Sequence, residues 1–469
     1  MQEKLYFYFT NDLHSHFNNW PRVVSYMKER RNQLTKENIS HWLVDIGDHI
    51  DRVHPIAEAF LGKANIHLMN DLGYDLVTIG NNEGITLAHD VLYHLYDEAK
   101  FQVVCSNLFS RGDDTPHWLK PSVKLKSVGG VRIGVIGLTA PFNAYYHLLD
   151  WHVADIFPTL DQQLAELKGT VDIIILLSHL GIHEDRQIAE LYPEIDVIIG
   201  GHTHHLLETE EVVRNTMLTS AGKHCHYVGE VMLVWDHKEK KLIDKKAQTH
   251  NVTHLPMDDQ TVQMIDGFQD EAEKILSQSV VYTPRALEVD WYEQTPLIKA
   301  LTNTLLTWTD ADCAMLNAGL ILHDLGPGNI TKKDIHQACP HPINPCVVEL
   351  QGDELMEVIR ASITKEFMEY RLIGYGFRGK IVGKMVFAGL EIAIDEHKNK
   401  QEYIKSVTFK GEPLQSDKVY RVATADMFIF GNLLPEIVRA KTKTLYLPEY
   451  MRDLLAFTLT EKLSDILNE

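Results

Sequence analysis

The first half of the chain repeats one pattern, an apolar run that ends in a cluster of polar residues. Helix-like stretches such as 53–73 and 156–169 separate the runs. Near-continuous apolar runs divided by helical patterns indicate strands that are buried on both faces of an α/β sheet. Ligands bind such sheets beyond the carboxyl ends of the strands, which is where these polar clusters fall. The five segments span residues 5–16, 41–51, 74–83, 172–181 and 196–205.

The polar clusters contain seven side chains of the kinds that bind metal ions. Imidazole, carboxylate and amide oxygen, without any thiolate, suit Mn, Fe, Co or Zn. Seven ligands are too many for one four-coordinate ion, but they suit two ions that share a bridging group. Each residue alone would be an ordinary turn residue or a hydrogen-bonded core histidine, so the prediction depends on the whole set. The seven are Asp12, His14, Asp48, Asn81, His179, His202 and His204.

Composition and charge restrict the class of protein further. A chain of 469 residues with 45% hydrophobic and 23% charged residues suggests a globular protein of two domains. The net charge of −20 argues against a nucleic acid polymer as partner, whereas a small anionic substrate is compatible with it.

Five scattered cysteines without CxxC spacing favour reduced thiols and a cytoplasmic location. The first residues lack a signal-peptide pattern and no apolar stretch reaches ~18 residues, so no membrane association is expected.

The polar clusters resemble the motifs of the calcineurin-like metallophosphoesterases, and within them the bacterial 5′-nucleotidase group. The matching motifs are D-x-H at 12–14, G-D at 47–48, G-N at 80–81, S-H at 178–179 and G-H-x-H at 201–204. The resemblance implies an α/β (α+β) fold, with an N-terminal sandwich of two mixed sheets flanked by helices and a smaller α/β C-terminal domain.

The same resemblance assigns roles to the seven side chains. Asp12, His14 and His204 would hold one divalent ion, and Asn81, His179 and His202 would hold the other. Asp48 would bridge both ions, and a hydroxide between them would attack phosphorus. Asp45 is expected either to orient a ligand or to hold the end of its strand.

The motif that begins with G-N at 80–81 departs from the family pattern. In the family this motif reads G-N-H-E-x-D, in which the histidine protonates or stabilises the leaving oxygen and the aspartate orients that histidine. This chain has Asn82 and Ile85 at those positions. General acid catalysis contributes ~10²–10⁴-fold, so a poor leaving group should be affected most. We therefore treat Asn82, Asp48 and His16 as the catalytic candidates; His49 and His205 are alternatives to His16 that the sequence does not rank.

The second half resembles the C-terminal substrate domain of 5′-nucleotidases, although less closely. The expected division is a catalytic domain over 1–250, a linker segment over 251–282 with a helix near 261–278, and a substrate domain over 283–469. Leu322 replaces the family arginine of N-x-G-x-x-R, and residues 430–432 replace its terminal G-G-D-G-Y. Aromatic rings and a guanidinium are able to bind a base and a phosphate. The substrate-binding candidates are Asn317, Phe377, Arg378, Phe428 and Phe430.

The leading functional prediction is a phosphoesterase that uses two divalent metal ions (Mn, Zn, Fe or Co) and hydrolyses a nucleotide phosphomonoester. The loss of the usual histidine at Asn82 leaves a phosphodiester or diphosphate, such as a cyclic nucleotide or a nucleotide sugar, as an alternative substrate. A catalytically weak nucleotide-binding protein is the alternative from another class. The complete ligand set speaks against that last possibility.

Overall fold

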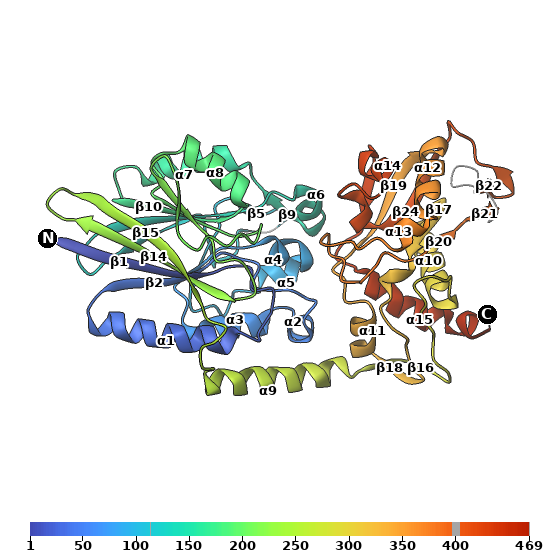
Figure 1. The fold of residues 1–469 in the computed structure, drawn as a ribbon, viewed down its shortest axis with the longest axis horizontal. Coiled ribbons are helices and arrows are strands. Elements are labelled where there is room, and N and C mark those ends of the chain that lie inside the picture. Colours follow the sequence, from blue (N-terminus) through green and yellow to red (C-terminus); the bar gives the residue numbers. More distant parts are fainter. Residues whose placement is uncertain (113, 396–403, 469) are drawn as a thin grey trace. The chain divides into compact units, whose positions relative to one another are not determined.

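The computed structural model describes residues 1–112, 114–395 and 404–468 (Figure 1). The chain divides into two compact units, Met1–Ala272 and Glu273–Glu469. The helix expected near 261–278 is present as α9, Asp259–Leu276. The functional boundaries expected at residues 250 and 282 stay a prediction. No helix among the described residues is long and apolar enough to cross a membrane.

The first sheet of the N-terminal unit has seven strands in the order β15-β14-β1-β2-β3-β4-β6. Strands β1, β2, β3, β4 and β6 pair in parallel, whereas β14 and β15 are antiparallel to their neighbours. The mixed sheet agrees with the prediction. Its strands are β1 Gln2–Thr10, β2 Ser40–Asp45, β3 Leu76–Val77, β4 Gln102–Val104, β6 Leu119–Lys120, β14 Tyr227–Asp236 and β15 Lys241–Asn251.

The second sheet has six strands in the order β12-β13-β11-β10-β8-β7. Strands β8, β10, β11 and β13 are parallel, and the two edge strands β7 and β12 run antiparallel to them. A short antiparallel pair, β5 (Leu108–Ser110) with β9 (Trp151–Val153), forms a separate two-stranded sheet. The six strands are β7 Ser122–Lys126, β8 Arg132–Thr139, β10 Ile173–His179, β11 Val197–Gly200, β12 Glu211–Val213 and β13 Thr216–Thr219.

Strand β10 shows why its sequence is apolar throughout. Successive side chains of a strand point to opposite faces. Ile173, Ile175 and Leu177 face the core between the two sheets, whereas Ile174 and Leu176 face the core under α7 and α8. A strand covered on both faces needs no polar alternation, so the unbroken run IIILL is explained by its central position.

Helices cover the outer faces of the two sheets (Figure 1). Helices α1 (Trp20–Lys36) and α3 (Lys63–Leu72) flank the first sheet, and α7 (Ile156–Leu167) and α8 (Ile182–Leu191) flank the second. The predicted sandwich of two mixed sheets with flanking helices is confirmed. The remaining helices of this unit are the short α2 Pro55–Phe60, α4 Asn81–Thr86, α5 His89–Tyr93 and α6 Asn143–Tyr146.

The C-terminal unit is a smaller α/β structure, as predicted. Its main sheet has the order β20-β17-β24-β19-β25, and α10 (Pro296–Trp308) and α15 (Met451–Asn468) contact each other beside it. The strands of this sheet are β17 Cys313–Asn317, β19 Pro345–Gln351, β20 Met385–Ala388, β24 Val419–Ala425 and β25 Lys443–Leu445. The smaller elements are β16 Ser279–Thr283, β18 Gly328–Thr331, β21 Leu390–Ile394, β22 Ile404–Phe409, β23 Glu412–Pro413, α11 Lys332–Ala338, α12 Gly352–Ser362, α13 Lys365–Met368 and α14 Pro435–Arg439.

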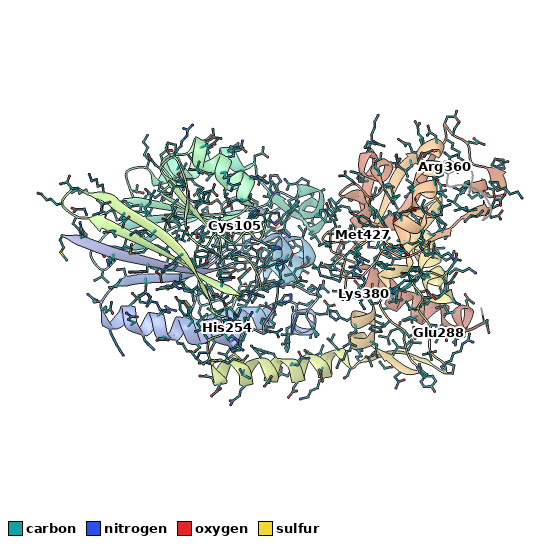
Figure 2. All side chains as sticks on the ribbon, in the orientation of Figure 1. Cys105, His254, Glu288, Arg360, Lys380 and Met427 are labelled. Atoms are coloured by element: carbon teal, nitrogen blue, oxygen red, sulfur yellow. The ribbon has the colours of Figure 1, made fainter. Side chains whose placement is uncertain are left out.

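All five cysteines are free and buried in the structure. Cys105, labelled in Figure 2, follows β4 in the N-terminal unit. Burial raises the pKa of its thiol to about 12, so this sulfur is a poor nucleophile and metal ligand. The metal-binding candidates are therefore the nitrogen and oxygen donors.

Candidate metal centre

The loops after β1, β2, β3, β10 and β11 bring the seven predicted ligands together. Six of them form two groups of donor atoms, each with members less than 4.8 Å apart. The first group is Asp12, His14 and His204, and the second is Asp48, His179 and His202. We call these seven side chains, including Asn81, the candidate metal centre.

In the first group, the ring nitrogens of two histidines face each other. His14 Nε2 lies 3.0 Å from His204 Nε2. Asp12 Oδ1 lies 3.8 Å from His14 Nε2 and 3.4 Å from His204 Nε2. Donors that bind one ion at about 2.1 Å in a tetrahedral arrangement are roughly 3.4 Å apart, so the spacing fits a shared cation.

In the second group, the Asn81 amide oxygen lies among the other donors. Asn81 Oδ1 is 2.8 Å from His202 Nδ1 and 3.3 Å from His179 Nε2. Asp48 Oδ1 is also 3.3 Å from His179 Nε2. The Asn81 oxygen is thus directed at two imidazole nitrogens, as expected of a donor that shares an ion with them.

Asp48 faces both groups. Its Oδ2 lies 3.7 Å from His14 Nε2, and its Oδ1 lies next to His179. The Asp48 carboxylate therefore presents one oxygen to each of the two groups.

Electrostatics couples Asp48 to His179. Burial opposes ionisation of Asp48, but the nearby His179 ring outweighs it, so the Asp48 pKa lies below its ordinary value. Burial likewise opposes the charging of His179, yet Asp48 raises the His179 pKa to about 10. A cation bound to both side chains would take the place of this proton.

Several hydrogen bonds orient the ligands. The His179 Nδ1 lies 2.7 Å from the Ile46 carbonyl oxygen, which turns Nε2 toward the second group. Asn11 Nδ2 donates to Asp12 Oδ2 (2.7 Å), and the His202 backbone N–H donates to the same oxygen at 3.0 Å. These contacts hold the candidate donor atoms in the positions described above.

Five of the seven candidate ligands have a left-handed backbone, with φ between 50° and 70°. Residues other than glycine seldom adopt this conformation, and such strain collects where function requires a particular side-chain direction. The five are Asp12, His14, Asp48, His202 and His204.

Two glycines allow the loops after β2 and β3 to approach each other. Gly47 has φ of 88°, and a Cβ built there would lie 2.3 Å from the Gly80 nitrogen. A Cβ on Gly80 would lie 2.1 Å from Asp48 Oδ1. A side chain at Gly47 would push the two loops apart, and one at Gly80 would displace Asp48, so the G-D and G-N motifs need glycine for steric reasons.

Glu83 holds these two loops in place. Its buried carboxylate accepts three backbone N–H groups, from Asp48 at 3.0 Å, Ile50 at 2.9 Å and Gly80 at 2.9 Å. Burial and the Asp48 charge raise the Glu83 pKa to about 7. A cation beside Asp48 would favour the ionised form that three donors require.

Asn82 is positioned against His14. Its Nδ2 donates to the Ile50 carbonyl oxygen at 3.0 Å and lies 3.0 Å from His14 Nδ1, and its backbone N–H donates to Asp48 Oδ1 at 2.7 Å. The side chain is therefore engaged in holding a candidate ligand.

The three histidines that are candidates to replace the family's leaving-group histidine differ in their surroundings. His49 is buried, and its ring packs edge-on against Trp20 at 5.2 Å. His205 is exposed and lies 2.9 Å from Thr203 Oγ1. His16 is exposed beside the candidate metal centre and stacks on the ring of His224 at 3.6 Å. His224 was not singled out by any sequence motif.

Asp45 stabilises the turn before Asp48 through hydrogen bonds. Its carboxylate accepts the Thr10 hydroxyl and the Gly47 backbone N–H. No ligand side chain is among these partners, so the geometry agrees with the strand-end alternative.

The C-terminal candidates show two kinds of environment. Phe428 is fully buried and Phe377 is 4% exposed, so both rings pack inside the unit, and their role in stacking a base stays a prediction. Phe377 instead stacks on His341 at 5.1 Å. Phe430 lies against Tyr375 at 5.9 Å, and Tyr375 is 47% exposed.

The polar candidates of this unit are anchored by the backbone. Asn317 is fully buried, and its Nδ2 donates to the Val382 carbonyl oxygen at 2.7 Å. The Arg378 backbone N–H donates to His341 Nδ1 at 2.9 Å. Their roles in substrate binding stay predictions.

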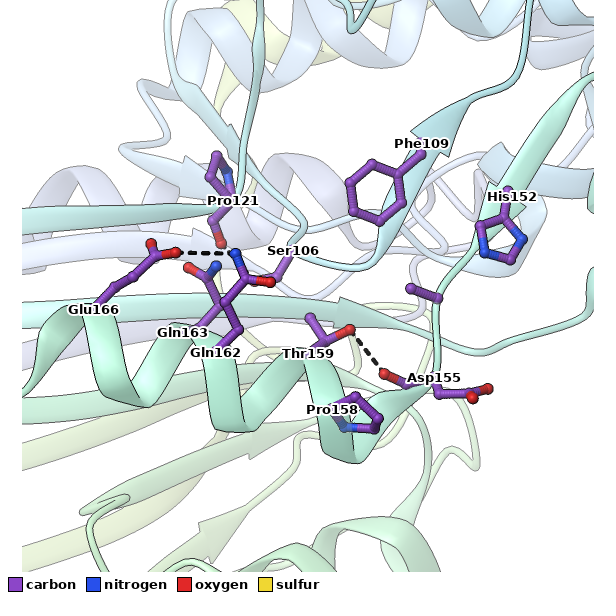
Figure 3. Close-up of a pocket in the computed structure, with 11 residues that line it drawn as sticks. Ser106, Phe109, Pro121, His152, Asp155, Pro158, Thr159, Gln162, Gln163 and Glu166 are labelled. Atoms are coloured by element: carbon purple, nitrogen blue, oxygen red, sulfur yellow. Dashed lines mark hydrogen bonds between the residues drawn. The ribbon is translucent and has the colours of Figure 1, made fainter.

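A separate cavity of about 600 Å³ lies beside α7 (Figure 3). Among the described residues, its lining contains the carboxylates of Asp155 and Glu166 and no lysine or arginine. None of the seven candidate ligands lines it, and its negative charge makes it unsuitable for a phosphate.

Comparison with known proteins agrees with the site. Residues 5–206 match the family model for the calcineurin-like phosphoesterase, and residues 275–432 match that for the 5′-nucleotidase C-terminal domain. An uncharacterized metallophosphoesterase of Bacillus subtilis, YunD, is 42% identical over 463 residues, covering 98% of this chain and 100% of its own.

Two solved structures show a similar fold. The NAD nucleotidase of Haemophilus influenzae has a TM-score of 0.69 at 18% identity, with 98% of this chain and 96% of that chain covered. A putative 5′-nucleotidase of Staphylococcus aureus has a TM-score of 0.68 at 18% identity, with 98% and 97% covered.

The sandwich fold and the clustered donors therefore define a phosphoric ester hydrolase of the kind that uses divalent metal ions. The chain belongs to the calcineurin-like phosphoesterase family and carries the C-terminal domain of the 5′-nucleotidases.

Proposed function

We propose that the protein hydrolyses a nucleotide phosphomonoester at a centre of two divalent metal ions. The observation that carries this proposal is the position of Asp48, which offers one carboxylate oxygen to each of the two ligand groups. The 5′-nucleotidase C-terminal domain supports a nucleotide as substrate.

In this proposal, Asp12, His14 and His204 hold one ion. Asn81, His179 and His202 hold the other, and Asp48 bridges the two. When bound, the ions supply an activated water molecule at neutral pH and positive charge that stabilises the phosphoryl oxygens. The set of nitrogen, carboxylate and amide donors suits Mn, Zn, Fe or Co.

The chain's own residues position the substrate and the ligands. Only two of the seven donors, Asp12 and Asp48, carry negative charge, so the loaded centre is a net cation within a protein of net charge −20. Such a centre attracts a phosphate. Asn82 holds His14 and takes the place of the family's leaving-group histidine.

The presence of Asn82 at the position of the family's leaving-group histidine also supports a second candidate function. Asn82 has a side chain that donates to the Ile50 carbonyl oxygen, and an amide does not protonate a leaving alkoxide. A diphosphate bond, whose leaving group is a phosphate, needs an acid less. Cleavage of a nucleotide sugar or a similar diphosphate is therefore the alternative.

We further propose a reducing, cytoplasmic environment, because all five cysteines are free.

The test compares three substrates with manganese-loaded protein: a nucleoside 5′-monophosphate, a nucleotide sugar and p-nitrophenyl phosphate. Fast phosphate release from the monophosphate supports the leading proposal. Turnover of the nucleotide sugar and the aryl phosphate alone supports the diphosphate alternative. Tight nucleotide binding without turnover of any of the three would contradict both and indicate a binding protein.

A further inference from the structure

We propose that the stacked imidazoles of His16 and His224 form the contact surface for the substrate's leaving-group oxygen, in place of the family histidine that Asn82 has replaced. This inference rests on the proposed function. It adds a residue, His224, that lies outside all five motifs of the N-terminal half.

The two rings are placed by different parts of the fold. His16 lies in the loop after β1, and its backbone N–H donates to the Leu13 carbonyl oxygen at 3.0 Å. His224 precedes β14, and its backbone N–H donates to the Asp12 carbonyl oxygen at 2.9 Å. Both rings are thus tied to the loop that carries Asp12 and His14.

The rings form one unit. Their centroids are 3.6 Å apart with an interplanar angle of 23°. Among the described residues, neither ring makes a hydrogen bond through its nitrogens. His16 is exposed and His224 is partly exposed, so their N–H groups are available to a bound molecule.

The His16–His224 pair lies beside the same candidate ligand, His14, as the position of the lost family histidine. The His224 ring lies edge-on to His14, with centroids 6.0 Å apart. Asn82 contacts the same His14 ring through Nδ2 at 3.0 Å. His224, one member of the pair, and Asn82 therefore both lie against the His14 ring.

The chemistry requires no change in the charge of the pair. In the hydrolysis, the bond between phosphorus and the leaving oxygen breaks, and its electron pair stays on that oxygen. The attacking water supplies OH to phosphorus and the remaining proton to the leaving oxygen. A neutral imidazole donates one N–H hydrogen bond to the oxygen as its negative charge grows, and its own proton count is unchanged.

The test uses His16→Phe and His224→Phe, since phenylalanine keeps a stacking ring and removes the N–H donor. The matched control is His254→Phe, an exposed histidine of the N-terminal unit whose ring contacts neither His16 nor His224. Removal of one donor to a developing oxyanion typically costs roughly 10²–10³-fold in kcat. At this partly exposed position we expect a loss of about 10–100-fold with a nucleoside monophosphate, and almost none with p-nitrophenyl phosphate.

Two further readouts separate this role from a structural one. Metal content of both variants should equal that of the wild type. Affinity for a monophosphate analogue with CH₂ in place of the leaving oxygen should be unchanged, because the analogue lacks the acceptor.

Equal losses with both substrates, a weakened analogue, or no loss in either variant would overturn the inference. Inactivity of the wild-type protein toward every phosphate ester would instead contradict the proposed function itself.

Discussion

The carboxylate of Glu83 accepts the backbone N–H of Asp48 at 3.0 Å, so a buried side chain of the short helix α4 fixes the residue that faces both ligand groups. The same carboxylate accepts N–H groups from Ile50 and Gly80. The loop after β2 and the loop after β3 are therefore joined through one side chain. The position of Asp48 in the candidate metal centre therefore depends on a residue outside the seven candidate ligands.

Glu83→Gln should lower both stability and metal affinity. An amide places its NH₂ group opposite at least one of the three N–H donors, and a buried unpaired donor costs about 1–3 kcal/mol. We expect a lower urea midpoint and weaker Mn²⁺ binding by calorimetry. Glu190→Gln, on the exposed side of α8, is the control and should change neither. A variant with wild-type metal affinity would show that Glu83 does not position Asp48.

Asp48→Asn should remove activity and reduce the bound metal. The change keeps the shape of the side chain but removes the charge that both ions would share. Mass spectrometry of metal-loaded, desalted protein should show less than half of the wild-type content. Asp71→Asn, at an exposed position, should keep the full content. Full metal content in the Asp48 variant would place the bridging role elsewhere.

Asn82→Ala should weaken metal binding more than it weakens folding. The alanine loses the contact with His14 Nδ1, and groups that orient a metal ligand contribute about 10–100-fold to affinity. Titration with Mn²⁺ measures the change, and Asn18→Ala, at an exposed position before α1, serves as control. If affinity is unchanged while turnover falls, Asn82 acts on the substrate and not on His14.

His341 should make the stability of the C-terminal unit depend on pH. Burial lowers the pKa of this histidine to about 3, against an ordinary value of 6.5. Below pH 6.5 the unfolded chain binds a proton that the folded state excludes until about pH 3. The contribution of the neutral His341 to the free energy of unfolding is therefore fully present above pH 6.5. It is lost as the pH falls below 6.5, by up to about 1.4 kcal/mol per pH unit.

The measurement compares urea unfolding of wild type and His341→Gln at pH 7 and pH 5. The variant should be less stable at pH 7, because its bonds to Leu320 and Arg378 are disturbed. The difference in free energy of unfolding between wild type and variant should be about 2 kcal/mol smaller at pH 5 than at pH 7. The reason is that glutamine does not titrate, so only the wild type loses stability as its unfolded chain binds a proton. His323→Gln, at an exposed position, should show no such shrinkage.

Much of the fold, and the clustering of the seven candidate ligands, was predictable because both depend on local patterns. Each predicted ligand ends or follows an apolar run, and parallel strands bring such ends to one edge of the sheet. Runs such as IIILL in β10 had to be central strands, since both faces are covered.

Other features depend on contacts that sequence spacing does not reveal. Glu83 bonds to the loop after β2, which lies 35 positions away along the chain. His224 reaches His16 only because β14 pairs with β1. The burial of Phe428 and Phe377 depends on packing within the C-terminal unit, and an aromatic residue near a glycine has the same sequence pattern whether it is buried or exposed.

The most direct test of the central claim is phosphate release from a nucleoside 5′-monophosphate while Mn²⁺ is added to chelator-treated protein. The proposed centre predicts no release without metal, and a rate that reaches its plateau when two equivalents per chain are bound. A rate that is independent of added metal, or that is complete after one equivalent, would contradict a two-metal phosphomonoesterase.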